Sequence, residues 1–473
     1  MIFSNLLLAS LAAAGVVHVP LTVRSPHNNE LSKRNMASGE TSVHKAFLYA
    51  TLEMGTPPQN VSVSFDSGSG ILAVPASNTT ACTEGKCPSD GQFDVGKSSS
   101  WKYRTPGSQW YGTGMWGRET IKYAGEALED FATYVPFDKM NNNAGIFGNS
   151  PIKNGSQSFV QGLFEKKKIS RALYSINADA PILNYHKDPE KLDRQGISNV
   201  YYGGYDRAKY EGPMVTVDRK SYGGYEMAMS GFSVDGEPVD DQQEHTVVLD
   251  TGGVTVTVPN KTMAAIAAKY GGEYSTRHGL WVVPCDAKPV VQYGFGYTSI
   301  DLDMYQFIEP VSTGGCGFKH LKISKDNEKL LLIGPQLISK ALVIYDNERQ
   351  QIHIARAKYT DESDVVEITG DIPGAVKYSD WLAGKPLPEE PSSKEESSSK
   401  EESSSKEESS SKEESSSKEE SSSKEESSSK EESSSKEESS SKEESSSKEE
   451  SSSKEESSSK EEPSHTTLAV AAV

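Results

Sequence analysis

The clearest hydrophobic pattern in the chain is a two-residue alternation, which predicts short strands. Val61, Val63 and Phe65 alternate with serines, so one face of this segment is apolar and the other polar, as in a half-buried strand. Residues 49–54 and 200–202 have the same character. Clusters of Gly, Asn and Ser, which favour turns, separate such segments. The chain is therefore expected to be rich in short strands.

Helical periodicity is clear in only two places. In residues 260–270 the apolar positions that share one face are Met263, Ile266, Ala267 and Tyr270. We expect Asn260 to be the N-cap of this helix and Gly271 to end it. A second predicted helix covers residues 159–168, with an inward face made of Phe159, Val160, Leu163 and Phe164. Sparse helix among many short strands predicts an all-β architecture.

An internal duplication divides the body of the chain into two similar halves. In each half an apolar run ends in Asp, a hydroxyl residue and Gly, at Asp66 and at Asp250. A Val-Pro pair follows each aspartate at the same offset, and an apolar-apolar-Gly triplet ends 82 and 84 residues later, at Gly148 and Gly334. Repeated motifs at matched spacing predict two homologous lobes.

The repeated turn supplies the parts of an acid–base pair. Two carboxylates within hydrogen-bond reach cannot both ionise, so they share one proton. The ionised member can take a proton from a bound water while the protonated member polarises a scissile carbonyl. Gly68 and Gly252 allow the two chains to approach closely, and Ser67 and Thr251 can hydrogen-bond across the two-fold axis. A single such turn also fits an Asx-type turn, but two matched turns favour an enzyme.

These motifs resemble those of the pepsin-like (A1) family of aspartic endopeptidases, most of all its fungal secreted members. The resemblance covers residues 45–357 and includes, besides both aspartates, the segments 55–58, 202–206 and 344–354. It implies an all-β, bilobal fold with a central cleft and few short helices. It also implies a secreted, monomeric acid endopeptidase that acts on protein or peptide substrates without a cofactor or metal.

The resemblance assigns roles to individual residues. It implies that Tyr111 to Gly114 form a flap that covers the cleft and that Ile146 lines the pocket beside the scissile bond. The candidate residues are the catalytic Asp66 and Asp250, the supporting Ser67, Gly68, Ser69, Thr251 and Gly252, and the flap and substrate-binding Tyr111, Gly112, Thr113, Gly114 and Ile146.

Two departures from the family pattern lie beside these residues. Gly253 stands where the family usually has Thr or Ser, so the second carboxylate loses an outer donor that Ser69 provides to the first. Ala73 stands where the family usually has a Trp that partners the flap tyrosine, so Tyr111 is expected either to be less well held or to pair with Trp110 or Trp116 instead. These two departures favour the alternative function. In that alternative the chain is a catalytically weak or silent member of the fold that acts as a binding or cell-surface protein.

The N-terminal region has the features of a secretory leader and a pro-segment. An apolar stretch at residues 6–17 contains small residues that fit a signal-peptide cleavage site. Lys33 and Arg34 form a dibasic pair at which processing would leave Asn35 as the mature N-terminus. The alternatives are a buried N-terminal helix and an ordinary exposed basic pair.

Cysteines and sequons agree with an extracellular location. The four cysteines allow three connectivities, of which local spacing favours Cys82–Cys87 and Cys285–Cys316. The candidate glycosylation sites are Asn60, Asn78, Asn154 and Asn260.

Composition sets the tail apart from the body. Hydrophobic residues make up 34% of the chain, but residues 392–462 repeat SSSKEE with no apolar residue at all. This repeat holds 12 Lys and 24 Glu and carries −12 of the formal charge of −19. It cannot fold around a core, so it is expected to be a disordered spacer, or a glycosylated stalk that associates with the cell wall.

The remaining composition excludes other classes. The body is mildly acidic, which argues against nucleic-acid binding, and no apolar run is long enough for a transmembrane anchor. The expected organisation is a signal peptide (1–15), a short pro-segment (16–34), an N-terminal lobe (35–212), a C-terminal lobe (213–385), a linker (386–391), the repeat tail (392–462) and a C-terminal end (463–473).

Overall fold

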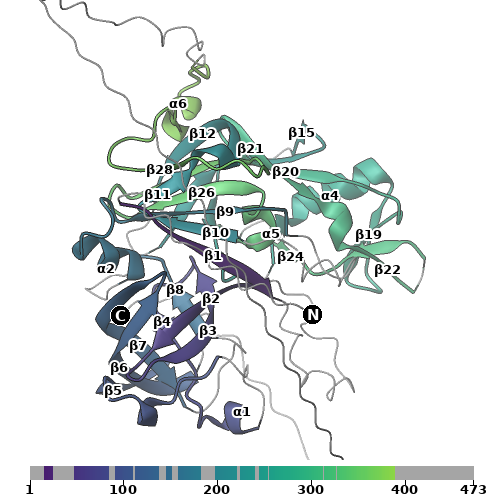
Figure 1. Cartoon of the computed structure of the whole chain (residues 1–473). Helices are drawn as coiled ribbons and strands as arrows, with labels where there is room; N and C mark the ends of the chain where they lie inside the picture. The colour runs from purple at the N-terminus through teal and green to yellow at the C-terminus, as the bar shows by residue number, and fades with distance from the viewer. Residues whose placement is uncertain are drawn as a thin grey trace, which may run out of the picture. The chain divides into compact units, whose positions relative to one another are not determined.

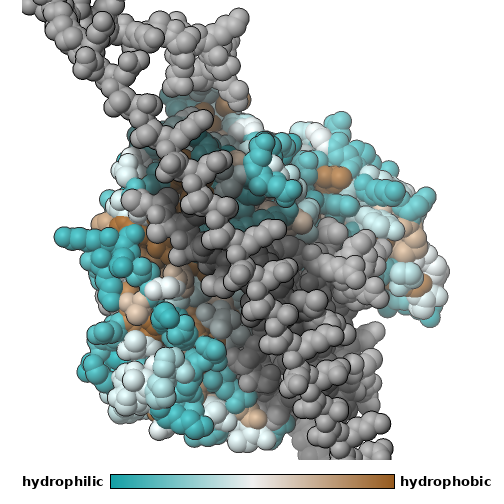
Figure 2. Space-filling view, viewed as in Figure 1, coloured by the Kyte–Doolittle hydropathy of each residue, from teal (hydrophilic) through white to brown (hydrophobic). Residues whose placement is uncertain are grey.

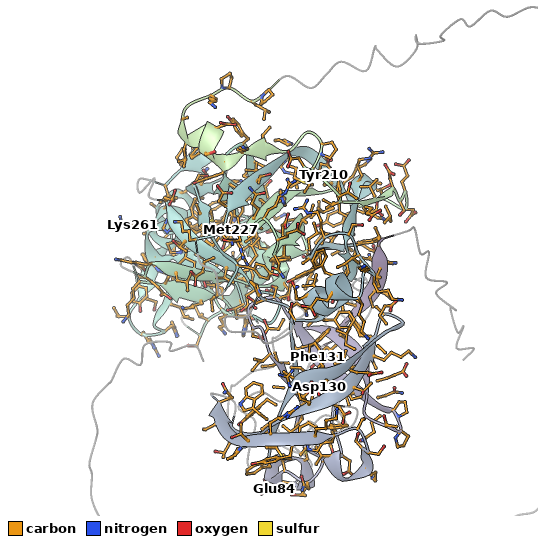
Figure 3. All side chains as sticks on the ribbon, turned by 90° about the vertical axis from the view of Figure 1, so that its left-hand side faces the viewer. Glu84, Asp130, Phe131, Tyr210, Met227 and Lys261 are labelled. Atoms are coloured by element: carbon orange, nitrogen blue, oxygen red, sulfur yellow. A yellow bond between two sulfur atoms is a disulfide. The ribbon has the colours of Figure 1, made fainter. Side chains whose placement is uncertain are left out.

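Strands dominate the part of the chain that the structure describes, as the sequence pattern predicts. A computed structural model describes residues 15–24, 47–84, 91–109, 112–137, 145–151, 158–182, 198–220, 224–239, 244–253, 255–312, 314–325 and 328–388. Two β-rich lobes are visible, the first in purple and blue and the second in teal and green (Figure 1). Figure 3 shows Glu84, Asp130 and Phe131 in the first lobe, and Met227 and Lys261 in the second.

The first lobe is built on strands that follow one another in one mixed sheet. Its strands are β2 (Phe47–Met54), β3 (Gln59–Asp66), β4 (Leu72–Ala73), β5 (Lys102–Gln109), β6 (Gly112–Tyr123), β7 (Glu126–Pro136) and β8 (Gly145–Gly148). The alternating segment lies in β3, between β2 and β8. Both of its faces are buried, because Ser62 and Ser64 are 3% and 1% exposed. The expected half-buried strand is therefore an interior strand.

The second lobe consists of smaller sheets. These are β13 (Glu226–Met229), β16 (His245–Leu249) and β25 (Leu330–Ile333); β15 (Glu237–Pro238), β14 (Gly231–Val234), β20 (Val290–Phe295) and β21 (Thr298–Asp303); β17 (Thr257–Pro259) and β24 (Lys322–Ser324); and β18 (Glu273–Ser275), β19 (Leu280–Val283), β23 (Cys316–Phe318) and β22 (Ile308–Pro310). A disulfide joins Cys285 to Cys316. It ties the segment after β19 to β23 within the last of these sheets.

Strands from the N-terminal, middle and later parts of the chain join the two lobes. In order across the sheet they are β29 (Val376–Lys377), β12 (Tyr210–Asp218), β27 (Gln351–Ala357), β26 (Ala341–Asp346), β9 (Leu173–Ala178), β10 (Ser198–Tyr202) and β1 (Val17–Arg24). The strand β1 pairs with β10 on one side and with β2 on the other. The separate pair β11 (Gly204–Asp206) and β28 (Val365–Glu367) adds the chain beyond β27 to the fold. The expected pro-segment thus contains a strand with neighbours on both sides.

Helices are few and short in the described residues. They are α1 (Thr80–Thr83), α2 (Phe159–Glu165), α4 (Asn260–Tyr270), α5 (Pro335–Ile338) and α6 (Tyr378–Leu382), with 3₁₀ turns η2 (Val95–Lys97), η3 (Arg207–Lys209) and η4 (Met304–Phe307). Helix α4 has the expected bounds and ends at Gly271, but its N-cap is Pro259. Asn260 is instead the first helical residue, no side chain caps the helix, and Asn260 Oδ1 accepts a hydrogen bond from Trp281 Nε1 at 3.1 Å.

The two halves repeat one strand pairing. In the first half β3 runs parallel to β8, with Ser64 opposite Ile146 and Asp66 opposite Gly148. In the second half β16 runs parallel to β25, with Val248 opposite Leu332. Each aspartate strand therefore lies beside the apolar-apolar-Gly segment of its own half, which is the structural basis of the repeated spacing.

On the face shown in Figure 2, the coloured residues are mostly hydrophilic, and hydrophobic residues form small patches among them. Among these residues, no helix is both long and apolar enough to cross a membrane.

Candidate active site

Four hydrogen bonds clasp the two repeated turns together. The backbone N–H of Ser67 donates to Thr251 Oγ1 at 2.9 Å, and the N–H of Thr251 donates to Ser67 Oγ at 3.0 Å. Each hydroxyl then donates onward, Ser67 Oγ to the Leu249 carbonyl at 2.7 Å and Thr251 Oγ1 to the Phe65 carbonyl at 2.8 Å. Both hydroxyl residues are completely buried. The two turns thus hold one another in a fixed, nearly symmetric arrangement.

Each glycine of the turns lies against the carboxyl group of the other half. A Cβ added at Gly68 would lie 2.8 Å from Asp250 Oδ2 and closer still to its Oδ1. A Cβ added at Gly252 would lie 2.8 Å from Asp66 Oδ2 and closer still to its Cγ. Only glycine fits these two positions without displacing a carboxyl group.

The two carboxyl groups have unequal hydrogen-bond partners. Asp66 Oδ1 accepts from the N–H groups of Gly68 and Ser69 at 2.7 and 3.1 Å, and its Oδ2 accepts from Ser69 Oγ at 2.7 Å. Asp250 Oδ1 accepts from the N–H of Gly252 at 3.0 Å. No hydroxyl replaces Ser69 on the second side, because the corresponding residue is Gly253. Negative charge is therefore better stabilised at Asp66.

Burial makes Asp250 hard to ionise. It raises the pKa of the Asp250 carboxyl well above its usual range, and the neighbouring charge and hydrogen bond of Asp66 raise that pKa further. The backbone N–H groups of Gly252 and Gly253 oppose the effect only in part. This arrangement can keep one proton on Asp250 while Asp66 accepts hydrogen bonds.

Buried residues that the sequence did not single out make hydrogen bonds that hold the two turns in place. The N–H of Asn149 donates to the backbone carbonyl of Asp66 at 2.8 Å. The hydroxyl of Tyr225 donates to the carbonyl of Asn149 at 3.0 Å. The hydroxyl of Tyr345 donates at 3.0 Å to the carbonyl of Leu249, which also accepts from Ser67 Oγ. Only the position of Asn149, directly after a repeated triplet, offered a sequence signal.

The expected flap region forms a β-hairpin. Strands β5 and β6 pair antiparallel, with Ser108 opposite Thr113 and Gln109 opposite Gly112. Trp110 and Tyr111, which connect them, lie outside the described residues, so the expected partner of Tyr111 stays a prediction.

Trp116, on β6, packs against Tyr134 of the neighbouring strand β7. Its ring meets the Tyr134 ring edge-on, with centroids 5.0 Å apart. Tyr134 lies opposite Ala73 in the pairing of β7 with β4. Ile146, expected to line a pocket, is 2% exposed and packs in the same small apolar cluster as Ala73 and Tyr134.

The other sequence-predicted residues divide by whether they are described. Asn60 and Asn78 are exposed, and Asn260 is half-buried in the first turn of α4. The predicted residues Lys33, Arg34, Cys87 and Asn154 lie outside the described part of the chain, so the processing site and the Cys82–Cys87 bond stay predictions. Among the described residues, no group of His, Cys, Asp and Glu could hold a metal ion.

Known proteins resemble this chain over most of its folded part. The family model described as eukaryotic aspartyl protease matches residues 48–357. Aspartic proteinase yapsin-3 of Saccharomyces cerevisiae is 25% identical over 76% of this chain and 77% of its own length. An acid protease of Saccharomycopsis fibuligera is 26% identical, over 66% and 82%. Pepsin A of Canis lupus familiaris is 23% identical, over 65% and 80%.

Proposed function

The chain belongs to the eukaryotic aspartyl protease family and is an aspartic endopeptidase, and we propose that Asp66 and Asp250 are its catalytic pair. The observation that carries the proposal is the mutual clasp of the two turns, which brings an aspartate from each half to one place. Relatives named as aspartic and acid proteases support the same chemistry.

The unequal surroundings of the two carboxyl groups support different roles. Asp66, with three donors, takes the proton from a bound water, which then attacks the scissile carbonyl carbon. Asp250, whose pKa is raised by burial, donates a hydrogen bond to the carbonyl oxygen and stabilises the negative charge that develops there. The proton taken by Asp66 passes to the leaving amine as the peptide bond breaks, which restores the pair.

The hairpin of β5 and β6 serves as a flap in this proposal. Residues 111–114 close over a bound peptide, and the Tyr111 side chain and nearby backbone groups hold the substrate while water is excluded. Protein and peptide chains are the substrates.

We extend the proposal to a secreted zymogen. Residues 1–15 act as a signal peptide, and residues 16–34 as a pro-segment that is cut after Arg34. The position of β1 supports a structural role for this segment, because it pairs with both β10 and β2. A cut after Arg34 would break the covalent link, while these hydrogen bonds still hold the strand in the sheet.

The repeat at 392–462 is proposed to be an extracellular spacer between the protease and the cell wall. Its 24 Glu and 12 Lys keep it solvated at neutral pH. Half-protonation of the glutamates, near pH 4.3, would bring the repeat close to neutral. A spacer needs no further contact with the enzyme.

Digestion of a mixed peptide library at acid pH, with and without the transition-state mimic pepstatin, tests the catalytic proposal. The Asp66→Asn and Asp250→Asn variants should each lose more than about 1,000-fold in turnover, because acid–base steps alone contribute about 10²–10⁴-fold. The exposed Asp361→Asn serves as the matched control and should keep full activity. Cleavage that survives both pepstatin and either catalytic substitution would refute the assignment.

A further inference from the structure

Tyr134 makes an unusual contact with the proposed flap. Its side chain is completely buried in β7, and its hydroxyl lies 2.7 Å from the Gly112 carbonyl oxygen and 3.0 Å from that of Gly107. The single hydroxyl proton is therefore shared between two acceptors. Gly107 lies on β5 and Gly112 on β6, so one side chain joins both strands where the hairpin tip begins.

Two glycines let the hairpin come this close. Gly112 has φ of 136°, a conformation that favours glycine, and its carbonyl reaches the hydroxyl in that conformation. A Cβ added at Gly107 would lie 2.9 Å from Trp116 Cδ1 and 3.4 Å from Tyr134 Cε2. The backbone of both strands thus rests directly on the aromatic side chains.

Tyr134 also packs against residues near the aspartate strand of the first half. Tyr134 packs in one cluster with Ala73 and Ile146. Ile146, on β8, lies opposite Ser64 on β3. Ser64 precedes Asp66 by two residues on β3. A large side chain at position 73 would compete with the Tyr134 ring for this space. The position of Tyr134 therefore explains why residue 73 is a small Ala. Tyr134 therefore contacts the flap at its hydroxyl and packs with Ile146 on β8, the strand that pairs with the aspartate strand β3.

We propose that Tyr134 is a positioning residue that fixes the height of the flap over the catalytic pair. The inference rests on the proposed function of the hairpin as a flap. Tyr134 does not touch the reacting atoms, so its loss changes how well the closed flap holds substrate rather than the proton transfers. A satisfied hydroxyl in an ordinary core would have no such effect on binding.

The test compares Tyr134→Phe with Tyr123→Phe. Tyr123, on β6, is also buried, but its hydroxyl has no hydrogen-bond partner in the described part of the chain. Tyr134→Phe keeps the ring and removes only the hydroxyl. We expect KM for a peptide substrate and Ki for pepstatin to rise about tenfold, as for loss of one buried hydrogen bond. We expect kcat to change less than about threefold and its pH profile to stay in place, while the control variant matches the wild type.

Hydrogen–deuterium exchange provides a second measurement that does not depend on activity. Backbone amides of residues 105–115 should exchange faster in Tyr134→Phe than in the control, with the second lobe unchanged. Unchanged KM, Ki and flap exchange would overturn the inference, even if the melting temperature fell. A wild-type protein without pepstatin-sensitive cleavage would instead refute the proposed function, and flap exchange would still decide the role of Tyr134.

Discussion

Gly68 lies against the carboxyl group of Asp250, so the turn that carries one aspartate forms part of the wall around the other. The same relationship holds in reverse for Gly252 and Asp66. Neither carboxyl group can therefore move without disturbing the opposite turn.

Substitution of Gly68 by Ala should displace the Asp250 carboxyl group, because the new Cβ would lie 2.8 Å or less from its oxygens. We expect kcat to fall at least about 100-fold, since proton transfer requires correct hydrogen-bond geometry. Peptide hydrolysis rates measure the effect. Gly370→Ala is the control, because no atom lies within 4 Å of a Cβ there, and equal activity of the two variants would contradict the prediction.

Gly253→Ser should supply the hydroxyl that Asp250 lacks. The new Cβ would lie 3.2 Å from Asp250 Oδ2, near enough for a hydroxyl to donate as Ser69 does to Asp66. A donor to the ionised form lowers the raised pKa of Asp250. Activity that needs protonated Asp250 is lost as pH rises through this pKa, so the alkaline limb should move to lower pH by about one unit.

The pH dependence of kcat/KM gives the measurement. Gly253→Ala introduces the same Cβ without the hydroxyl, and its alkaline limb should stay where the wild-type limb lies. An equal shift in both variants would show that crowding, and not the hydroxyl, causes it.

Asp250→Asn should stabilise the fold in a pH-dependent way. The folded pKa of Asp250 is raised by burial, so the wild type has its full stability below the unfolded pKa of about 3.9 and loses stability as pH rises toward the folded pKa. Asn has no proton to lose. The free energy of unfolding of the variant, relative to wild type, should therefore be larger at pH 7 than at pH 3.5, by about 1.4 kcal/mol per unit of raised pKa.

Denaturant unfolding at the two pH values measures this difference. A variant whose advantage is the same at pH 3.5 and pH 7 would show that the Asp250 carboxyl does not resist ionisation.

Tyr345→Phe should affect catalysis more than binding. The hydroxyl of Tyr345 donates to the Leu249 carbonyl, which also accepts from Ser67 Oγ. Its loss frees the second turn to shift, and we expect kcat to fall about threefold to tenfold with KM nearly unchanged. Tyr293→Phe loses a similar bond, 3.0 Å from its hydroxyl to the Thr257 carbonyl, and should lose stability alone. A matching fall of kcat in both variants would argue against a positioning role for Tyr345.

The sequence predicted the geometry of the two repeated turns well, because each turn is encoded locally and twice. An apolar strand that ends in Asp, a hydroxyl residue and Gly specifies a tight turn at Asp66 and again at Asp250. The hydroxyls of Ser67 and Thr251 then bond each other's turn as expected. The all-β, bilobal architecture follows from the same duplication.

The residues that the sequence did not reveal depend on distant neighbours. Tyr345 meets Leu249 across 96 residues of chain, and Tyr134 meets Gly112 across 22. A buried tyrosine in an apolar run gives no local sign of which carbonyl its hydroxyl will find. The strand β1 was missed for a similar reason, since its main partner, β10, lies more than 170 residues away.

The hydrogen bonds between the two turns can form only late in synthesis of the chain. Ser67 and Thr251 are separated by 184 residues, which a ribosome adds in roughly 10 to 40 s at about 5–20 residues per second. Throughout that interval the nascent chain carries Asp66 without Asp250. Strands β26 and β27, which complete the joining sheet, follow nearly 100 residues later. If Asp66 and Asp250 form the catalytic pair as proposed, a growing chain cannot digest its neighbours, because the half made last holds the second carboxyl group.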